Sequence, residues 1–269
     1  MWDDADPTPR EIRAAFLRFV EKFHEEHGYT RNFAALASTL GIRIESASVN
    51  KAFVTPDGEP LILLDTDTAT SRRLFTILHE IAHHLFWRAR DGDLKAYLDA
   101  YFYKQPEVIR SHEEEYCYEA AALLLMPTRV LQECVCNHTF SPLAVFALAK
   151  QTGASHQAAM RRVIYAHDFP VHAVLVSPER QVIDSVSHGQ KREKYAVGKD
   201  FILEPEHPLV CGSYVPGQLA RFEAPVPFKG GGRSWKSKVL AALEPSSYRI
   251  LGFFMDSYPS NTSQMQSLF

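Results

Sequence analysis

The sequence predicts an α+β protein that is built in three parts. Apolar residues recur at helical spacing through most of the chain up to about residue 168, interrupted by a short strand-rich stretch between residues 42 and 64. After Pro170, β-rich runs and turn residues replace the helical pattern. A proline at position 127 ends a long helical pattern. We therefore expect domains at residues 1–127, 128–168 and 169–269.

The composition is that of an ordinary globular protein. Of 269 residues, 46% are apolar and 23% charged, and a net charge of −3 does not favour binding to DNA or to an anionic membrane. The strongly apolar run from Ala120 to Met126 is much shorter than the roughly 18 residues of a membrane-spanning helix. The segment Met1 to Asp4 lacks both the basic region and the apolar stretch of a secretory signal. We expect a cytoplasmic protein with no membrane partner and with its four cysteines reduced.

The first part should hold two helices, a small sheet and two longer helices. Each helix is predicted by apolar residues at helical spacing and ends near a glycine or a proline. The expected helices are Arg10 to His27, Phe33 to Leu40, Ser71 to Ala89 and Ser111 to Met126, and the expected strands are Ile42 to Ser46, Lys51 to Val54 and Pro60 to Leu64.

The middle part should be helical and the last part should be a sheet. After a short helix from Thr128 to Cys136, two helical stretches are separated by residues 152–155, which is the spacing of a helix-turn-helix. These stretches are Pro142 to Lys150 and His156 to Ala166, and the strands expected after them are Val171 to Val176, Val182 to Val186 and Arg249 to Phe254.

A metal-binding motif lies within the predicted helix from Ser71 to Ala89. Residues 79–83 read His-Glu-Ile-Ala-His, and residues four apart lie on one face of a helix, so His79 and His83 can bind one ion together. Glu80 can then reach a water on that ion, whose pKa a zinc-type cation lowers toward about 7. Glu80 is therefore the expected general base of peptide hydrolysis. His84 points elsewhere and should either support the site from outside or lie on the surface.

A catalytic zinc site needs a third protein ligand. Phe86 and Ala89 exclude the long motif in which a third histidine follows on the same helix. The acidic run at residues 113–115 offers carboxylates, and Glu114 shares the inward face of its helix with Cys117 and Ala121. We therefore expect Glu114 as the third ligand, and we expect its acidic neighbours to be a solvated helix start.

These residues resemble the ImmA/IrrE family of metallopeptidases. The family joins the two-histidine motif to a later helix that carries a ligand glutamate and ends in a Leu-Leu-Met-Pro stretch, here Leu124 to Pro127. Counted back from Pro127, the family's ligand position is Glu114. Tyr118, four residues further on, departs from the pattern. The resemblance implies a zincin-like domain, a helical domain similar to a helix-turn-helix, and a GAF-like C-terminal domain able to sense a small-molecule signal.

The resemblance also implies a function. It predicts cleavage of a helix-turn-helix transcriptional repressor, similar to DdrO, that switches on genes of the radiation and DNA-damage response. Zn²⁺ is the expected cofactor, while Mn²⁺ or another divalent ion also suits a His/His/Glu site. The strand Leu61 to Leu64 is a candidate edge along which a substrate peptide adds.

A second reading is a non-proteolytic DNA-binding regulator with a structural metal site. The span Pro142 to His167 carries Lys150, Arg161 and Arg162 and no acidic residue. A DNA-reading helix normally carries more phosphate-contacting and base-contacting residues, so we do not expect direct DNA binding. Structural zinc is usually closed by four protein ligands, whereas this motif offers three and a free carboxylate, which favours the enzyme.

Overall fold

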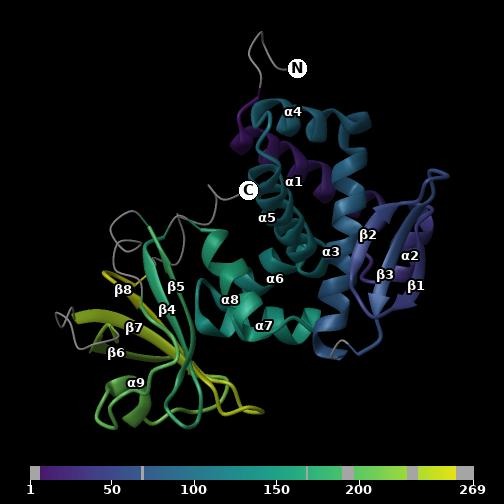
Figure 1. Cartoon of the computed structure of the whole chain (residues 1–269). Helices are drawn as coiled ribbons and strands as arrows, with labels where there is room; N and C mark the ends of the chain where they lie inside the picture. The colour runs from purple at the N-terminus through teal and green to yellow at the C-terminus, as the bar shows by residue number, and fades with distance from the viewer. Residues whose placement is uncertain (1–6, 68–69, 168, 190–196, 229–235, 259–269) are drawn as a thin grey trace. The chain divides into compact units, whose positions relative to one another are not determined.

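The computed structural model describes residues 7–67, 70–167, 169–189, 197–228 and 236–258 (Figure 1). The segment Met1 to Asp4 lies outside these residues. The chain divides into two compact units, residues 1–128 and residues 129–269. Both units combine helices with a sheet, so the predicted α+β class is confirmed.

The sheet of the first unit has three strands in the order β1-β3-β2. β3 (Pro60–Asp65) pairs in parallel with β1 (Arg43–Ala47) and in antiparallel with β2 (Lys51–Val54). The prediction that Leu61 to Leu64 forms an edge strand is therefore wrong. Because β3 is bonded on both sides, its backbone cannot accept another strand. β2 is an edge of this sheet instead.

The helices of the first unit surround a core that α3 and α5 share. They are α1 (Pro9–Glu26), α2 (Phe33–Thr39), α3 (Thr70–Arg88), a 3₁₀ turn (Ala89–Gly92), α4 (Asp93–Tyr101) and α5 (Pro106–Leu125). In α3, the predicted inward stripe of Ile77, Ile81 and Leu85 is buried, and the helix packs against both α5 and β2. Figure 1 shows α3 between the sheet and α5. The pair of helices therefore forms a rigid base for side chains that lie between them.

Two helical features of the first unit were not expected. α4 was not predicted at all, and α5 begins at Pro106, five residues before the predicted start at Ser111. Proline suits the first turn of a helix because it has no N–H to leave unpaired there. The acidic run at residues 113–115 consequently lies inside the helix, so the prediction that it forms a helix start is wrong.

The second unit holds the remaining helices and a five-stranded antiparallel sheet in the order β5-β4-β8-β7-β6. Its elements are α6 (Thr128–His138), α7 (Pro142–Thr152), α8 (His156–Tyr165), β4 (Val171–Val176), β5 (Val182–His188), α9 (Pro208–Cys211), β6 (Ala220–Pro225), β7 (Lys236–Leu243) and β8 (Ile250–Met255). β6 and β7 were not predicted. The helix-turn-helix-like and GAF-like assignments stay predictions.

α7 and α8 form the predicted helix pair and pack on the sheet. Gly153 ends α7 in the left-handed conformation, with φ of 75°, and the Ser155 side chain caps α8 by accepting a hydrogen bond from the Ala158 N–H. Arg161 of α8 forms an ion pair with Asp184 of β5. Part of the basic character of this segment is thus neutralised within the unit. Among the described residues, no helix has both the length and the apolar character needed to cross a membrane.

Candidate metal centre

α3 presents both histidines of the motif on one face. His79 and His83 lie one helical turn apart, and their ring centroids are 4.9 Å from each other. The helix continues without a break from residue 70 to 88, so the separation of the two rings is set by helix geometry. His83 is buried and His79 is half-buried.

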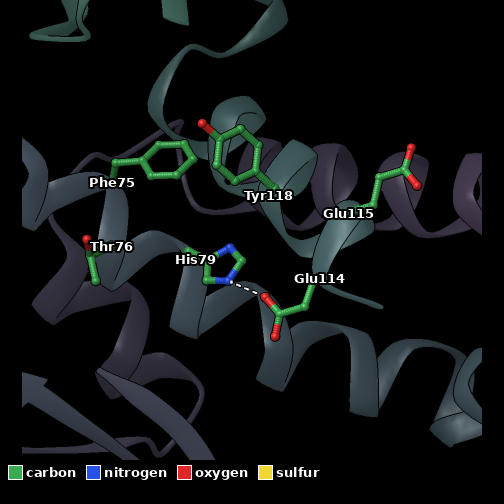
Figure 2. A pocket seen from close by; sticks show the side chains of 6 residues that line it. All are labelled: Phe75, Thr76, His79, Glu114, Glu115 and Tyr118. Atoms are coloured by element: carbon green, nitrogen blue, oxygen red, sulfur yellow. Dashed lines mark hydrogen bonds and ion pairs between the residues drawn. The ribbon is translucent and has the colours of Figure 1, made fainter. Parts of the chain in front are cut away.

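Glu114 reaches this pair of histidines from α5. Its Oε2 lies 3.1 Å from His79 Nε2, and its Oε1 lies 3.7 Å from His83 Nε2. Figure 2 shows the contact between His79 and Glu114. The structure thus brings together the three side chains that were predicted as metal ligands, with ligand atoms that all lie within 4.8 Å of one another.

The three side chains fit a divalent ion. Two ligand atoms of a tetrahedral ion with bonds of 2.0–2.1 Å are roughly 3.3 Å apart. The distance from Glu114 Oε2 to His79 Nε2 is 3.1 Å and that from Glu114 Oε1 to His83 Nε2 is 3.7 Å, so both are close to that value. The Glu114 side chain is 55% exposed, so it can adjust without disturbing the core. Imidazole and carboxylate donors suit zinc and other transition metals, so the donor set favours such an ion and leaves its identity open.

Glu80 lies beside the ligands as a buried acid. Only 7% of the residue is exposed. Burial is the largest effect on its carboxyl group and raises the pKa, while the nearby His83 and a hydrogen bond with the backbone of Ala52 on β2 lower the pKa by less. A carboxyl group with a raised pKa accepts and returns a proton more readily near neutral pH. The predicted base therefore occupies an environment that suits proton transfer.

Glu113 is a functional candidate that the sequence analysis missed. Its Oε1 lies 3.1 Å from His83 Nδ1 and accepts a hydrogen bond of 2.6 Å from Trp87 Nε1. Burial alone would raise the pKa of Glu113, but the hydrogen bonds from His83 and Trp87 hold it below its usual value. Its side chain is 13% exposed, so the prediction that it is solvated is wrong.

The role of Glu113 follows from the two nitrogens of an imidazole ring. When Nδ1 donates its proton to Glu113, His83 Nε2, which lies 3.7 Å from Glu114 Oε1, is left with a lone pair that can bind an ion. A sequence signal existed: Glu113 precedes the buried residues Tyr116 and Ala120 by three and seven positions, the same spacing that selected Glu114.

The remaining residues near the motif have other partners. His84 is buried and its Nε2 donates to the Leu61 carbonyl over 3.2 Å, so it joins α3 to β3 and is not a surface residue. Burial lowers the pKa of His84 to about 4. Glu115 is 59% exposed in its side chain and lies 3.9 Å from His112, as expected for a solvated acid.

Two hollows meet at the candidate ligands. A cleft of about 700 Å³ contains Glu80, His83 and Glu113 together with Lys51 and Ala52 of the edge strand β2. A second, shallower pocket of about 420 Å³ is lined by Phe75, Thr76, His79, Glu114, Glu115 and Tyr118. His79 and Glu114 line both hollows. An extended chain lying across them would therefore pass directly over the candidate metal position.

Comparisons with known proteins find a matched domain that contains the candidate site. Residues 37–163 match the family described as "IrrE N-terminal-like domain", a span that includes the motif and Glu114. The chain is 26% identical over 198 residues to the "Radiation response metalloprotease IrrE" of Deinococcus radiodurans, and the match covers 66% of this chain. It spans 58% of that relative's length.

A solved structure shares the fold. The "Mycobacterium tuberculosis transcriptional regulator" has a TM-score of 0.54 and 13% sequence identity, over 92% of this chain and 81% of its own. At that identity the likeness concerns the fold alone. Together, the domain match at residues 37–163 and the curated relative show that the chain contains an IrrE N-terminal-like domain and is similar to the IrrE metalloprotease.

Proposed function

We propose that this protein is a metal-dependent endopeptidase that cleaves a helix-turn-helix repressor. The observation that carries the proposal is the convergence of His79, His83 and Glu114, with the buried acid Glu80 beside them in the same cleft. A site with three protein ligands leaves a position open for water and substrate, as catalytic zinc sites do. The name of the Deinococcus relative, a radiation response metalloprotease, supports this class of activity.

The side chains divide the chemistry among them. A bound divalent ion supplies a Lewis acid that polarises the peptide carbonyl and favours deprotonation of water. Glu80 takes the proton from the attacking water and returns it to the leaving amine, which its raised pKa favours. Glu113 holds the His83 ring in the tautomer that leaves Nε2 free for the ion.

The substrate is expected to bind along β2. Lys51 and Ala52 line the cleft that holds Glu80, and among the residues that the structure describes β2 pairs with β3 on one side only. An extended peptide can add to the open side through backbone hydrogen bonds, which depend little on its sequence. β2 thus takes the role that was first assigned to Leu61 to Leu64.

The repressor is proposed from the family relationship. A DdrO-like repressor whose loss switches on radiation and DNA-damage genes suits a relative of a radiation response metalloprotease. Zn²⁺ is the proposed cofactor, with Mn²⁺ as the second ion to examine. A small-molecule signal acting through the GAF-like region is part of the same proposal, and so is the absence of direct DNA binding.

The test is cleavage of purified candidate repressors by the full chain. With Zn²⁺ or Mn²⁺ we expect discrete fragments on a gel and by mass spectrometry. Chelation or the substitution Glu80→Gln should abolish them, while Glu107→Gln, an exposed acid on the same helix as Glu114, should not. Intact repressors in every condition, together with specific binding of the chain to promoter DNA in a gel shift, would favour the DNA-binding reading.

A further inference from the structure

The pocket beside His79 has a different character from the cleft that holds Glu80. Its exposed lining is mainly apolar, and two of its six lining residues are aromatic, Phe75 from α3 and Tyr118 from α5. The ring centroids are 4.8 Å apart and the rings meet edge to face. Across the ligands, the larger cleft carries charged side chains, including Lys51 and Lys95. The two sides of the candidate metal position therefore favour different chemical groups.

Tyr118 is placed to contact a ligand with its ring. The residue is 58% exposed, which is unusual for a large aromatic side chain next to a buried site. Its ring centroid lies 6.3 Å from that of His79. Figure 2 shows the Tyr118 hydroxyl pointing away from His79, so the side chain presents apolar ring surface beside the ligands. This geometry suits apolar contact and does not suit proton transfer.

We infer that Phe75 and Tyr118 form a specificity pocket for a bulky apolar side chain next to the scissile bond. The inference rests on the proposed peptidase function and names the substrate class of that site. His79 and Glu114 line the pocket, so a side chain seated in it belongs to a residue adjoining the carbonyl at the metal position. The volume of about 420 Å³ accommodates a leucine or phenylalanine side chain. Small or charged residues leave the two rings exposed to water and gain little.

A pair of metal-chelating probes tests the pocket without requiring turnover. Two peptide hydroxamates are compared that differ only in the side chain next to the chelating group, isobutyl in one and methyl in the other. Zinc-loaded wild-type protein should bind the isobutyl probe about 10- to 100-fold more tightly, the range that an apolar pocket gives for a few methylene groups. The ratio of the two dissociation constants is the measured quantity.

Substitutions then assign the preference to the two rings. Tyr118→Ala and Phe75→Ala should each reduce the ratio severalfold at unchanged zinc content, whereas Tyr118→Phe should keep it because the ring remains. Tyr103→Ala removes a tyrosine that is 71% exposed outside the pocket, and it should keep the ratio as well. Tyr118 is exposed, so its alanine variant is expected to fold, which a thermal melt checks.

The outcomes separate this inference from the proposed function. If both probes bind but wild-type protein does not discriminate between them, or if the alanine variants discriminate as well as wild type, the specificity pocket is refuted and the metal centre stands. If neither probe binds to zinc-loaded protein, no open metal position exists. That result overturns the proposed function and this inference together.

Discussion

The two units of the molecule differ in how their ionisable and polar side chains are grouped. In the first unit five ionisable side chains gather at one place, between α3 and α5: His79, Glu80, His83, Glu113 and Glu114. Among the described residues of the second unit, two side-chain contacts join separate elements. Arg161 bonds to Asp184, and His172 Nδ1 lies 2.8 Å from Ser187 Oγ. Separate pairs connect neighbouring elements, whereas a gathering of acids and imidazoles on two helices can hold an ion.

The difference also predicts where stability depends on metal. Several ionisable groups close together and away from water disfavour the folded state unless an ion or hydrogen bonds offset their desolvation. Metal binding should therefore stabilise the first unit and leave the second unchanged. The predictions below test this contrast, from the largest effect to the smallest.

Loss of a ligand should have the largest effect. His79→Ala leaves two protein ligands, so we expect bound zinc and peptidase activity both to fall to background. Elemental analysis and a peptide cleavage assay measure the two quantities, with Glu107→Gln as the control. If the His79→Ala protein still bound zinc at wild-type stoichiometry, the ion would bind elsewhere, and the expected difference in metal dependence between the two units would not hold.

Loss of the base should abolish turnover but keep the ion. Glu80→Gln removes the proton acceptor, so we expect kcat to fall roughly 10²- to 10⁴-fold while zinc content stays at the wild-type level. Steady-state kinetics and elemental analysis distinguish this variant from a ligand variant. A Glu80→Gln protein that keeps more than about a tenth of its activity would assign proton transfer to another group.

Glu113 should act through His83. Glu113→Ala removes the acceptor for His83 Nδ1, and we expect zinc affinity to fall about 10- to 100-fold, as for other groups that orient a ligand histidine. Competition with a fluorescent chelator measures the affinity, and Glu107→Ala is the matched control on the same helix. Equal zinc affinities in Glu113→Ala and Glu107→Ala would show that Glu113 bonds to Trp87 without affecting metal binding.

The stability of the metal-free protein should depend on pH through His84. Its folded-state pKa is lowered to about 4, so the unfolded chain binds the extra proton when the pH falls below about 6.5. The stabilising effect of a neutral His84 is therefore complete above that pH and is lost as the pH falls toward 4. Between pH 7 and pH 5 we expect wild type to lose about 1–2 kcal/mol more than His84→Gln. Urea unfolding at both pH values measures this, and parallel losses would contradict it.

The smallest effect is expected in the second unit. Arg161→Met leaves Asp184 buried without its ion pair, but Arg161 is 41% exposed in its side chain, so we expect a loss of only about 1–2 kcal/mol in the free energy of unfolding. Zinc affinity should not change. A weaker zinc affinity in this variant would show that the two units do not separate as described.

Local patterns in the sequence were sufficient for much of the fold. The spacing of apolar residues placed α1, α3 and the pair α7–α8 to within one or two residues at most ends. α4 was missed, and so were β6 and β7. The start of α5 was also misplaced: Val108 and Ile109 are apolar, but Arg110 and the polar residues 111–115 separate them from the apolar face that begins at Tyr116, although the helix continues back to Pro106.

The sequence by itself determined the elements of the site whose geometry is local. His79 and His83 are held on one face by the helical repeat, and the face of α5 selected Glu114. Tertiary structure alone decided that β3 is central and β2 an edge, and that Glu113 supports His83. The physical reason is that strand order and contacts between helices depend on residues far apart in the chain, which no local repeat encodes.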